Sequence, residues 1–178
     1  MKKIFLLLSL LVLVSGCATL SQSQCQSGDW YGIGQTDGSQ GADLSKLAQH
    51  RDACGEYTIQ IDGEAWRRGR MEGLKQYCRP LNGYQIGRYG SLMSNVCPTN
   101  LASNFSRAYN YGYKIYIVTQ KLLELESRLY DEEQAILDET LSREDRRHHL
   151  DDLKQLEKDI VAAKYHIDDM ERRNPYNR

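Results

Sequence analysis

The chain has 178 residues, with 23 lysines and arginines against 24 acids, and its formal net charge is −1. A chain so close to neutral does not have the strong basic excess typical of nucleic-acid-binding proteins, so we expect neither DNA nor RNA as a partner. The length suits one domain with a core, or a small domain with a helical extension.

The first predicted element is a secretory signal peptide over residues 1–16. Two lysines precede an apolar run from Ile4 to Val14, interrupted only by Ser9, which is the layout of an export signal. The run is shorter than the about 20 residues that span a bilayer. Small residues then lead directly to Cys17. The sequence Val-Ser-Gly-Cys resembles a bacterial lipobox, in which the cysteine is acylated and the chain is cut before it.

Lipidation at Cys17 implies a location and a membrane partner. We expect a fatty acid such as palmitate on this cysteine and delivery to the outer membrane, facing the periplasm, because the next residue is Ala18 and not the aspartate that resembles a retention signal. Cleavage would remove Lys2 and Lys3 and change the net charge from −1 to −3. Residues 17–28 are polar and without periodicity, so they are predicted to be a lipidated tether.

The four cysteines that remain are predicted to form two disulfides: Cys25, Cys54, Cys78 and Cys97. An even number behind an export signal is typical of the oxidising periplasm. We pair neighbours in the sequence, Cys25 with Cys54 and Cys78 with Cys97. Zinc is the alternative use, but the chain has no Cys-x-x-Cys, and we expect neither a metal nor another cofactor.

Residues 29–113 repeat one motif, an aromatic residue three positions before a glycine. It occurs four times, as Tyr31-x-x-Gly34, Trp66-x-x-Gly69, Tyr84-x-x-Gly87 and Tyr109-x-x-Gly112. The spacing places both residues on one helical face. Because glycine costs a helix about 1 kcal/mol against alanine, close packing of backbones is the expected compensation.

These observations predict a compact, disulfide-linked cluster of short helices. Asp29, Asp62 and Ser103 are its candidate N-caps. Hairpin turns of a small β domain are the alternative, but residues 57–61 are the only candidate strand.

The same section resembles a known family. The residues that carry the resemblance are Asp29-Trp30, Gly34, Asp37-Gly38, His50, Cys54, Trp66-x-x-Gly69-Arg70-x-x-Gly73-Leu74-x-x-Tyr77-Cys78, Gly87, Gly90 and Cys97-Pro98. Over roughly residues 25–113 they are similar to Gram-negative envelope lipoproteins known only as a domain of unknown function. The resemblance implies export and disulfides, and it brings no activity or catalytic residues with it.

Residues 114–172 are predicted to form an antiparallel coiled-coil helical hairpin, followed by a tail over 173–178, so the fold class is all-α. One apolar stripe contains Ile115, Val118, Leu122, Leu125, Leu129 and Ile136, and a second contains Leu153, Leu156, Ile160, Ala163, Ile167 and Met170. Each stripe alternates steps of three and four residues, as a coiled-coil seam does, except that Glu132 interrupts the first before Ile136 recovers the register. The first register, if continued, would bury Glu157, Lys164 and Glu171, so we expect a break near residues 140–142. There Ser142-x-x-Asp145 resembles a capping pair.

Three groups of residues are candidates for a site. A basic face for anionic lipid or the cell wall would use Trp66, Arg67, Arg68, Arg70, Lys75, Arg79 and Arg88, although a solvated helix face is the simpler interpretation. An acid/base set would use Asp29, Asp37, Asp43 and His50, although N-capping and turns explain Asp29 and Asp37 more simply. His148-His149 is expected to be a solvated pair rather than a metal ligand.

The sequence favours a structural or adaptor lipoprotein of the cell envelope that binds another envelope protein. A glycan- or lipid-binding module that uses the aromatic and basic face is the alternative. A hydrolase is a third class, but no nucleophile elbow, Walker loop, zincin helix or dinucleotide fingerprint is present. We therefore predict that the protein is not an enzyme.

Overall fold

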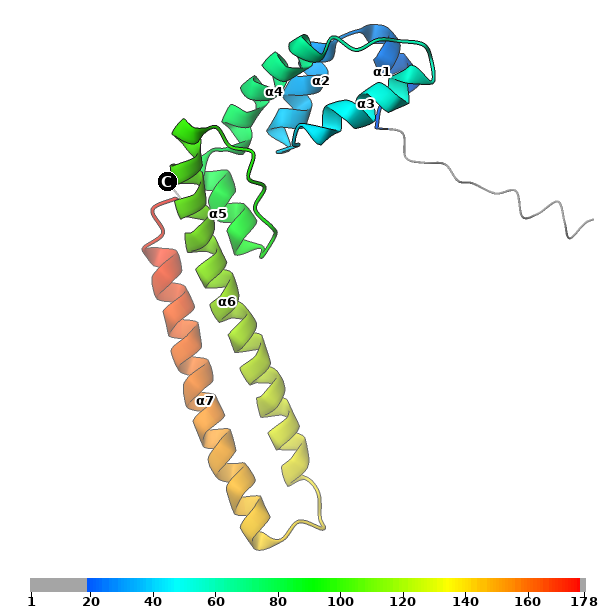
Figure 1. The fold of residues 1–178 in the computed structure, drawn as a ribbon. Coiled ribbons are helices and arrows are strands. Elements are labelled where there is room, and N and C mark those ends of the chain that lie inside the picture. Colours follow the sequence, from blue (N-terminus) through cyan, green and yellow to red (C-terminus); the bar gives the residue numbers. More distant parts are fainter. Residues whose placement is uncertain (1–18, 177–178) are drawn as a thin grey trace, which may run out of the picture. The chain divides into compact units, whose positions relative to one another are not determined.

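The computed structural model describes residues 19–176, which form helices and no strand. In chain order these are α1 (Gln22–Ser27), α2 (Trp30–Ser39), α3 (Ser45–Gly55), α4 (Gly63–Tyr77), α5 (Pro80–Arg88), α6 (Thr99–Ile136) and α7 (Arg143–Arg172), as Figure 1 shows. The predicted all-α class is confirmed. The signal peptide and Cys17 lie outside the described residues. The chain divides into two compact units, residues 1–73 and 74–178.

In the first unit, α2 and α4 lie parallel and touch through their glycines. A Cβ added to Gly34 would lie 2.8 Å from the carbonyl carbon of Trp66, and one added to Gly69 would lie 2.8 Å from that of Tyr31. The glycine of each motif therefore contacts the peptide group of the aromatic residue in the other motif. Only glycine allows two backbones to come so close.

In the second unit, α5 and α6 repeat this arrangement. A Cβ at Gly87 would lie 3.0 Å from the carbonyl carbon of Tyr109, and one at Gly112 would lie 3.1 Å from that of Tyr84. The four sequence motifs thus pair two by two, in the same geometry within each unit. The expected compensation for helical glycine, close backbone packing, is observed in both units.

Each unit also contains one disulfide. Cys25 is bonded to Cys54, with Cα atoms 5.6 Å apart, and Cys78 is bonded to Cys97, with Cα atoms 5.7 Å apart. These are the expected pairs. By the loop-entropy argument each closure stabilises its unit by about 3 kcal/mol.

The segment predicted to be a tether differs from that expectation. Residues 19–28 are folded, since α1 lies within them and both Leu20 and Cys25 belong to the core of the first unit. Leu20 is 4% exposed. The disulfide to Cys54 and the burial of Leu20 hold this segment on the unit, although its sequence is mostly polar. Residues 57–61 also differ from the candidate strand, because they form no strand and instead pack Ile59 and Ile61 against the same core.

Helices α6 and α7 of the second unit lie side by side and antiparallel. Buried Leu125, Leu156 and Ile160 pack together, with Leu122, Leu129 and Ala163 against them. The interruption falls between Ile136 and Arg143, where Ser142 caps α7 by accepting from the Asp145 amide at 3.1 Å. The break and its cap agree with the sequence, whereas the supercoiling of a coiled coil stays a prediction.

Two expectations for the second unit do not hold. Ser103 is not an N-cap, because α6 begins at Thr99, directly after Pro98, and continues through it. The same helix also runs without interruption past residue 113, where we expected the compact cluster to end. Residues 114–172 therefore share α6 with the glycine-rich section.

Candidate functional site

A buried polar network ties three helices of the first unit together. Asp37 lies on α2 between two glycines that bring α4 close, so the indole of Trp66 reaches it. The Trp66 Nε1–H donates to Asp37 Oδ2 at 2.7 Å, and His50 Nε2 of α3 is 2.8 Å from the same oxygen. Asp37 is 7% exposed and His50 is 1% exposed. The carboxylate is thus held by two donors from different helices.

The other nitrogen of His50 reaches the start of the described chain. His50 Nδ1 lies 2.8 Å from Thr19 Oγ1. A carboxylate accepts but cannot donate, so His50 Nε2 carries the proton toward Asp37, and in the neutral ring Nδ1 accepts from the Thr19 hydroxyl. Because Thr19 is the second residue after Cys17, the network anchors the chain next to its expected lipid attachment point.

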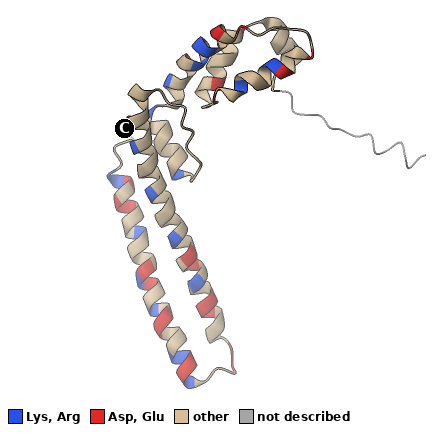
Figure 2. Ribbon diagram, viewed as in Figure 1, with Lys and Arg blue, Asp and Glu red and all other residues tan. Residues whose placement is uncertain are grey.

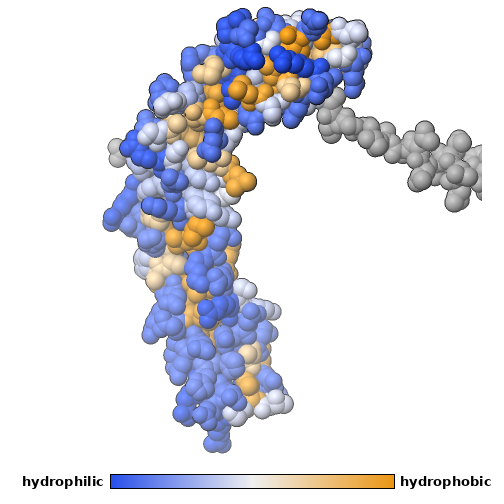
Figure 3. All heavy atoms as spheres, in the orientation of Figure 1, coloured by the Kyte–Doolittle hydropathy of each residue, from blue (hydrophilic) through white to orange (hydrophobic). Residues whose placement is uncertain are grey.

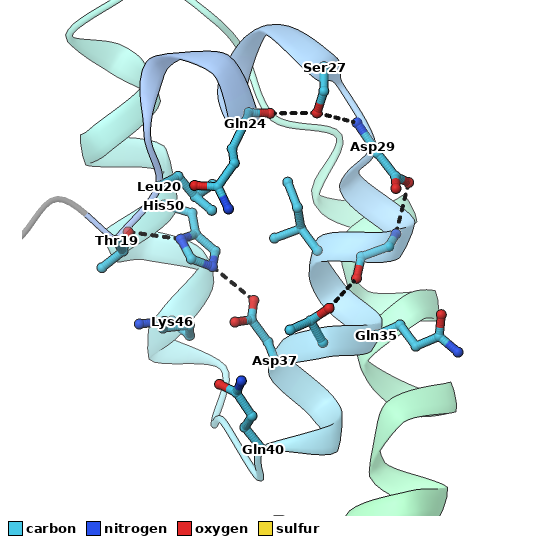
Figure 4. A pocket seen from close by; sticks show the side chains of 13 residues that line it. Thr19, Leu20, Gln24, Ser27, Asp29, Gln35, Asp37, Gln40, Lys46 and His50 are labelled. Carbon is cyan, nitrogen blue, oxygen red and sulfur yellow. Dashed lines mark hydrogen bonds and ion pairs between the residues drawn. The ribbon is translucent and has the colours of Figure 1, made fainter.

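A pocket of about 630 Å³ opens beside this network. Figure 4 shows Asp37 and His50 among the residues that line it, together with Gln24, Gln40 and Lys46. Side chains from α1, α2 and α3 line it together with Thr19 and Leu20. Hydroxyls, amides, one lysine and two carboxylates give it a mostly polar lining.

Of the suggested acid/base set, Asp37 and His50 are hydrogen-bonded to each other, Asp29 lines the same pocket, and Asp43 lies outside it. Asp29 caps α2 by accepting from the Gly32 amide at 2.9 Å, as expected. Asp43 accepts from the amide of Ser45 at 2.7 Å, and hydrogen bonds from Ser45 lower the pKa of the Asp43 carboxyl. For Asp37 the expected capping or turn role is wrong, because it lies inside α2 and holds His50 and Trp66.

The residues of the suggested basic face do not lie together on one open surface. Trp66 and Arg70 are buried, and the Arg70 guanidinium donates from Nε to the Ala42 carbonyl at 2.7 Å. Burial lowers the pKa of Arg70. Arg88, in the second unit, donates to Glu171 at 2.8 Å. These three side chains are engaged inside the protein, so they do not form an open binding face. The remaining four are exposed: Arg67, Arg68, Lys75 and Arg79.

Sequence reasoning also missed a polar cluster in the second unit. Glu171, near the end of α7, accepts from the Tyr84 hydroxyl at 2.6 Å and from Arg88 Nε at 2.8 Å. Burial, followed by the hydrogen bond to Glu171, raises the pKa of Tyr84 to about 12. Burial alone would raise the pKa of Glu171, but the two hydrogen bonds and the charge of Arg88 outweigh it and lower that pKa. The cluster joins α5 to α7 and is a structural element.

The two adjacent histidines of α7 have different surroundings. His148 is exposed, while His149 contacts Glu132 of α6. Among residues 19–176 no group of three or more histidines, cysteines and acids could hold a metal ion. No helix within that range combines the length and apolarity that crossing a membrane requires.

Comparison with known families gives two matches. Residues 29–114 match a family described as protein of unknown function, DUF2799, and residues 1–18 match the prokaryotic membrane lipoprotein lipid attachment site. No curated protein and no solved structure matches the chain. The two matched ranges contain the lipobox around Cys17 and the glycine-rich helices with three of the four disulfide cysteines. The chain therefore contains a region similar to the DUF2799 family and a lipoprotein lipid attachment site, which is consistent with an uncharacterised bacterial lipoprotein family.

Proposed function

We propose that the protein is an adaptor of the cell envelope, anchored by lipid at Cys17, in which the α6/α7 pair binds a partner protein. The proposal includes delivery to the outer membrane, for which Ala18 is the support, and the absence of catalytic activity. Two observations support the latter: Asp43 lies outside the pocket that Asp37 and His50 line, and Asp29 is engaged as the cap of α2.

The observation that carries the adaptor role is a second apolar stripe on α6. Leu123, Tyr130 and Leu137 are 53%, 61% and 71% exposed. They recur every seven residues, so Leu123 and Tyr130 share one face of α6, and Leu137, the C-cap of the helix, continues that row. This face differs from the face of α6 that packs against α7, on which Leu122 and Leu129 lie. Scattered exposed apolar residues are ordinary, but an aligned series on a charged helix marks an interaction surface.

The surroundings of the stripe indicate the chemistry of the partner. Lys, Arg, Asp and Glu alternate along α6 and α7 (Figure 2), and hydrophobic patches interrupt this hydrophilic surface (Figure 3). On α7, Val161 and Tyr165 are also exposed, at 52% and 71%. A long, straight apolar row bordered by charges of both signs fits the apolar face of another α-helix. We therefore propose an amphipathic helix of an envelope protein as the partner.

The test compares positions within α6. A tagged full chain is crosslinked in cells and recovered from the envelope, alongside Leu123→Asp/Tyr130→Asp and the control Arg128→Asp. Arg128 is exposed and lies outside the stripe. We expect the wild type and the control to recover the same partner, and the double variant to lose it while its helical circular dichroism is unchanged.

Two outcomes would overturn the adaptor role. In one, the double variant recovers the partner as well as the wild type does. In the other, sedimentation shows a wild-type dimer that the double variant lacks, which would make a second copy of the chain the occupant of the stripe.

The anchor and its destination have separate tests. Labelling with radioactive palmitate should mark the wild type and not Cys17→Ser, and label on both would contradict lipidation at this cysteine. Membrane fractionation should find the wild type in the outer membrane and Ala18→Asp in the inner membrane. An unchanged distribution would leave Ala18 without a role in sorting.

A further inference from the structure

Asp37 presents its carboxylate to the pocket of the first unit. Its Oδ2 takes the hydrogen bonds of Trp66 and His50, so Oδ1 is the oxygen that a ligand in the pocket would meet. Figure 4 shows the second oxygen directed away from His50, toward the space between Lys46 and Gln40. Asp37 Oδ1 is not a buried atom without a partner, so a ligand that displaces water from this oxygen must replace its hydrogen bond. The group that fits must carry an O–H or N–H donor.

The rim of the pocket is rich in amides and nearly neutral. Gln24, Gln35 and Gln40 line it, with Lys46 and Asp29 as its charged residues. Each amide both donates and accepts, and one cation offsets one anion. A ligand here meets donors and acceptors in a mixture, with little net charge from the rim.

This lining selects against charged ligands. A phosphate or carboxylate would place negative charge against Asp37 Oδ1, which is unfavourable in a partly buried site. An ammonium group would suit Asp37 and the amide oxygens but would lie near the like charge of Lys46. Hydroxyl groups donate, accept and carry no charge. The volume of about 630 Å³ lies in the range of small-molecule sites and suits a mono- or disaccharide.

The position of the pocket in the chain restricts the source of the ligand. Thr19 lines the pocket and is bonded to His50. Only Ala18 separates Thr19 from Cys17, so the lipid attachment point lies within about 7 Å of chain from the pocket wall. A ligand in the pocket is therefore close to the membrane surface.

From these observations we infer that the pocket binds a neutral sugar displayed at the membrane surface, with Asp37 Oδ1 accepting from a sugar hydroxyl. Gln40 and the other amides complete the hydrogen bonds. This site is separate from the α6 stripe, so either proposal can fail without the other.

The experiment uses the lipidated full chain in nanodiscs. Maltose and N-acetylglucosamine are titrated as soluble probes, inorganic phosphate is titrated as the charged probe, and Trp66 emission and calorimetry report binding. A parallel preparation contains a galactosyl glycolipid in the nanodisc. The variants are Asp37→Asn, Gln40→Ala and the matched control Gln49→Ala, whose glutamine is exposed on α3 outside the pocket.

We expect the wild type and Gln49→Ala to bind a sugar equally. Gln40→Ala should bind about 3- to 10-fold more weakly, the effect of one hydrogen bond, and Asp37→Asn should bind at least tenfold more weakly. Saturation by a soluble sugar indicates a free glycan as the source, and a response only to the glycolipid indicates a membrane head group. Either result supports the site.

Three results would overturn the proposal. These are the absence of saturable binding to every sugar probe, equal binding by Gln40→Ala and Gln49→Ala, and tighter binding of phosphate than of sugar. The Gln40 comparison keeps the test valid if Asp37→Asn does not fold, because Gln40 is exposed at the end of α2.

Discussion

Replacing Gly69 by alanine tests the glycine contact between α2 and α4. The new Cβ would lie 2.8 Å from the Tyr31 carbonyl carbon and 2.9 Å from the Gln35 amide nitrogen, where ordinary contact begins at 3.4 Å. These are backbone atoms and cannot rotate away, so the helices must separate by roughly 0.5 to 1 Å, which forfeits a quarter to a half of each contact between them.

The magnitude follows from two opposed effects. Overpacking a close contact costs about 3 kcal/mol, at the upper end of the usual range because the obstacle is backbone. Alanine favours the helix by about 1 kcal/mol relative to glycine, which offsets part of this cost. We therefore expect Gly69→Ala to lower the free energy of unfolding by about 2 kcal/mol, equivalent to a fall of roughly 8 to 16 °C in Tm for a unit of this size.

The assay is thermal unfolding followed by circular dichroism, with Gly55→Ala as the control. Gly55 ends α3, and nothing lies within 4 Å of a Cβ placed there. The control should be neutral or slightly more stable than the wild type. A Gly69→Ala protein as stable as this control would refute the claim that glycine is required for the α2/α4 contact.

Three further predictions concern other parts of the fold. The pKa of Tyr84 is about 12 against the ordinary 10.0, so its stabilisation is complete below pH 10.0 and is lost as pH rises toward 12. Denaturant unfolding across this range should show a loss of about 2 to 3 kcal/mol in the wild type that Tyr84→Phe does not share. Free-thiol counting on denatured, unreduced protein should find none, and Cys25→Ser should cost about 3 kcal/mol and expose the thiol of Cys54; two or more thiols in the wild type would contradict the bonding. Leu125→Asp should lower the helical signal and Tm because Leu125 is buried, whereas Leu123→Asp should leave both unchanged; equal effects would mean that the α6/α7 seam is not packed.

Features with a strong local pattern could be predicted from the sequence. The apolar stripes around Leu125 and Ile160 repeat over many turns, and the loss of register between them located the break before Ser142. The aromatic and glycine motif indicated closely packed helical faces, because several glycines in helices need a compensating contact. It did not indicate which motif pairs with which, since that depends on tertiary contacts.

Features that depend on contacts distant in the sequence were missed or misread. Residues 19–28 look like a tether because a six-residue helix and a single leucine produce no periodicity. Asp37, His50 and Trp66 are 13 and 16 residues apart in succession, so no motif joins them. The sequence did suggest Asp37 and His50 as members of one candidate set, but nothing in it linked Trp66 to them. Packing also takes Trp66 and Arg70 inside and removes them from the basic face.

The burial of Leu20 also bears on biogenesis. The expected processing at Cys17 lies only two residues before Thr19, and the folded first unit holds Thr19 through His50 and Leu20 through its core. An enzyme that acts at Cys17 on extended chain would therefore compete with the folding of this unit. On this reasoning, processing comes before the Cys25–Cys54 bond closes.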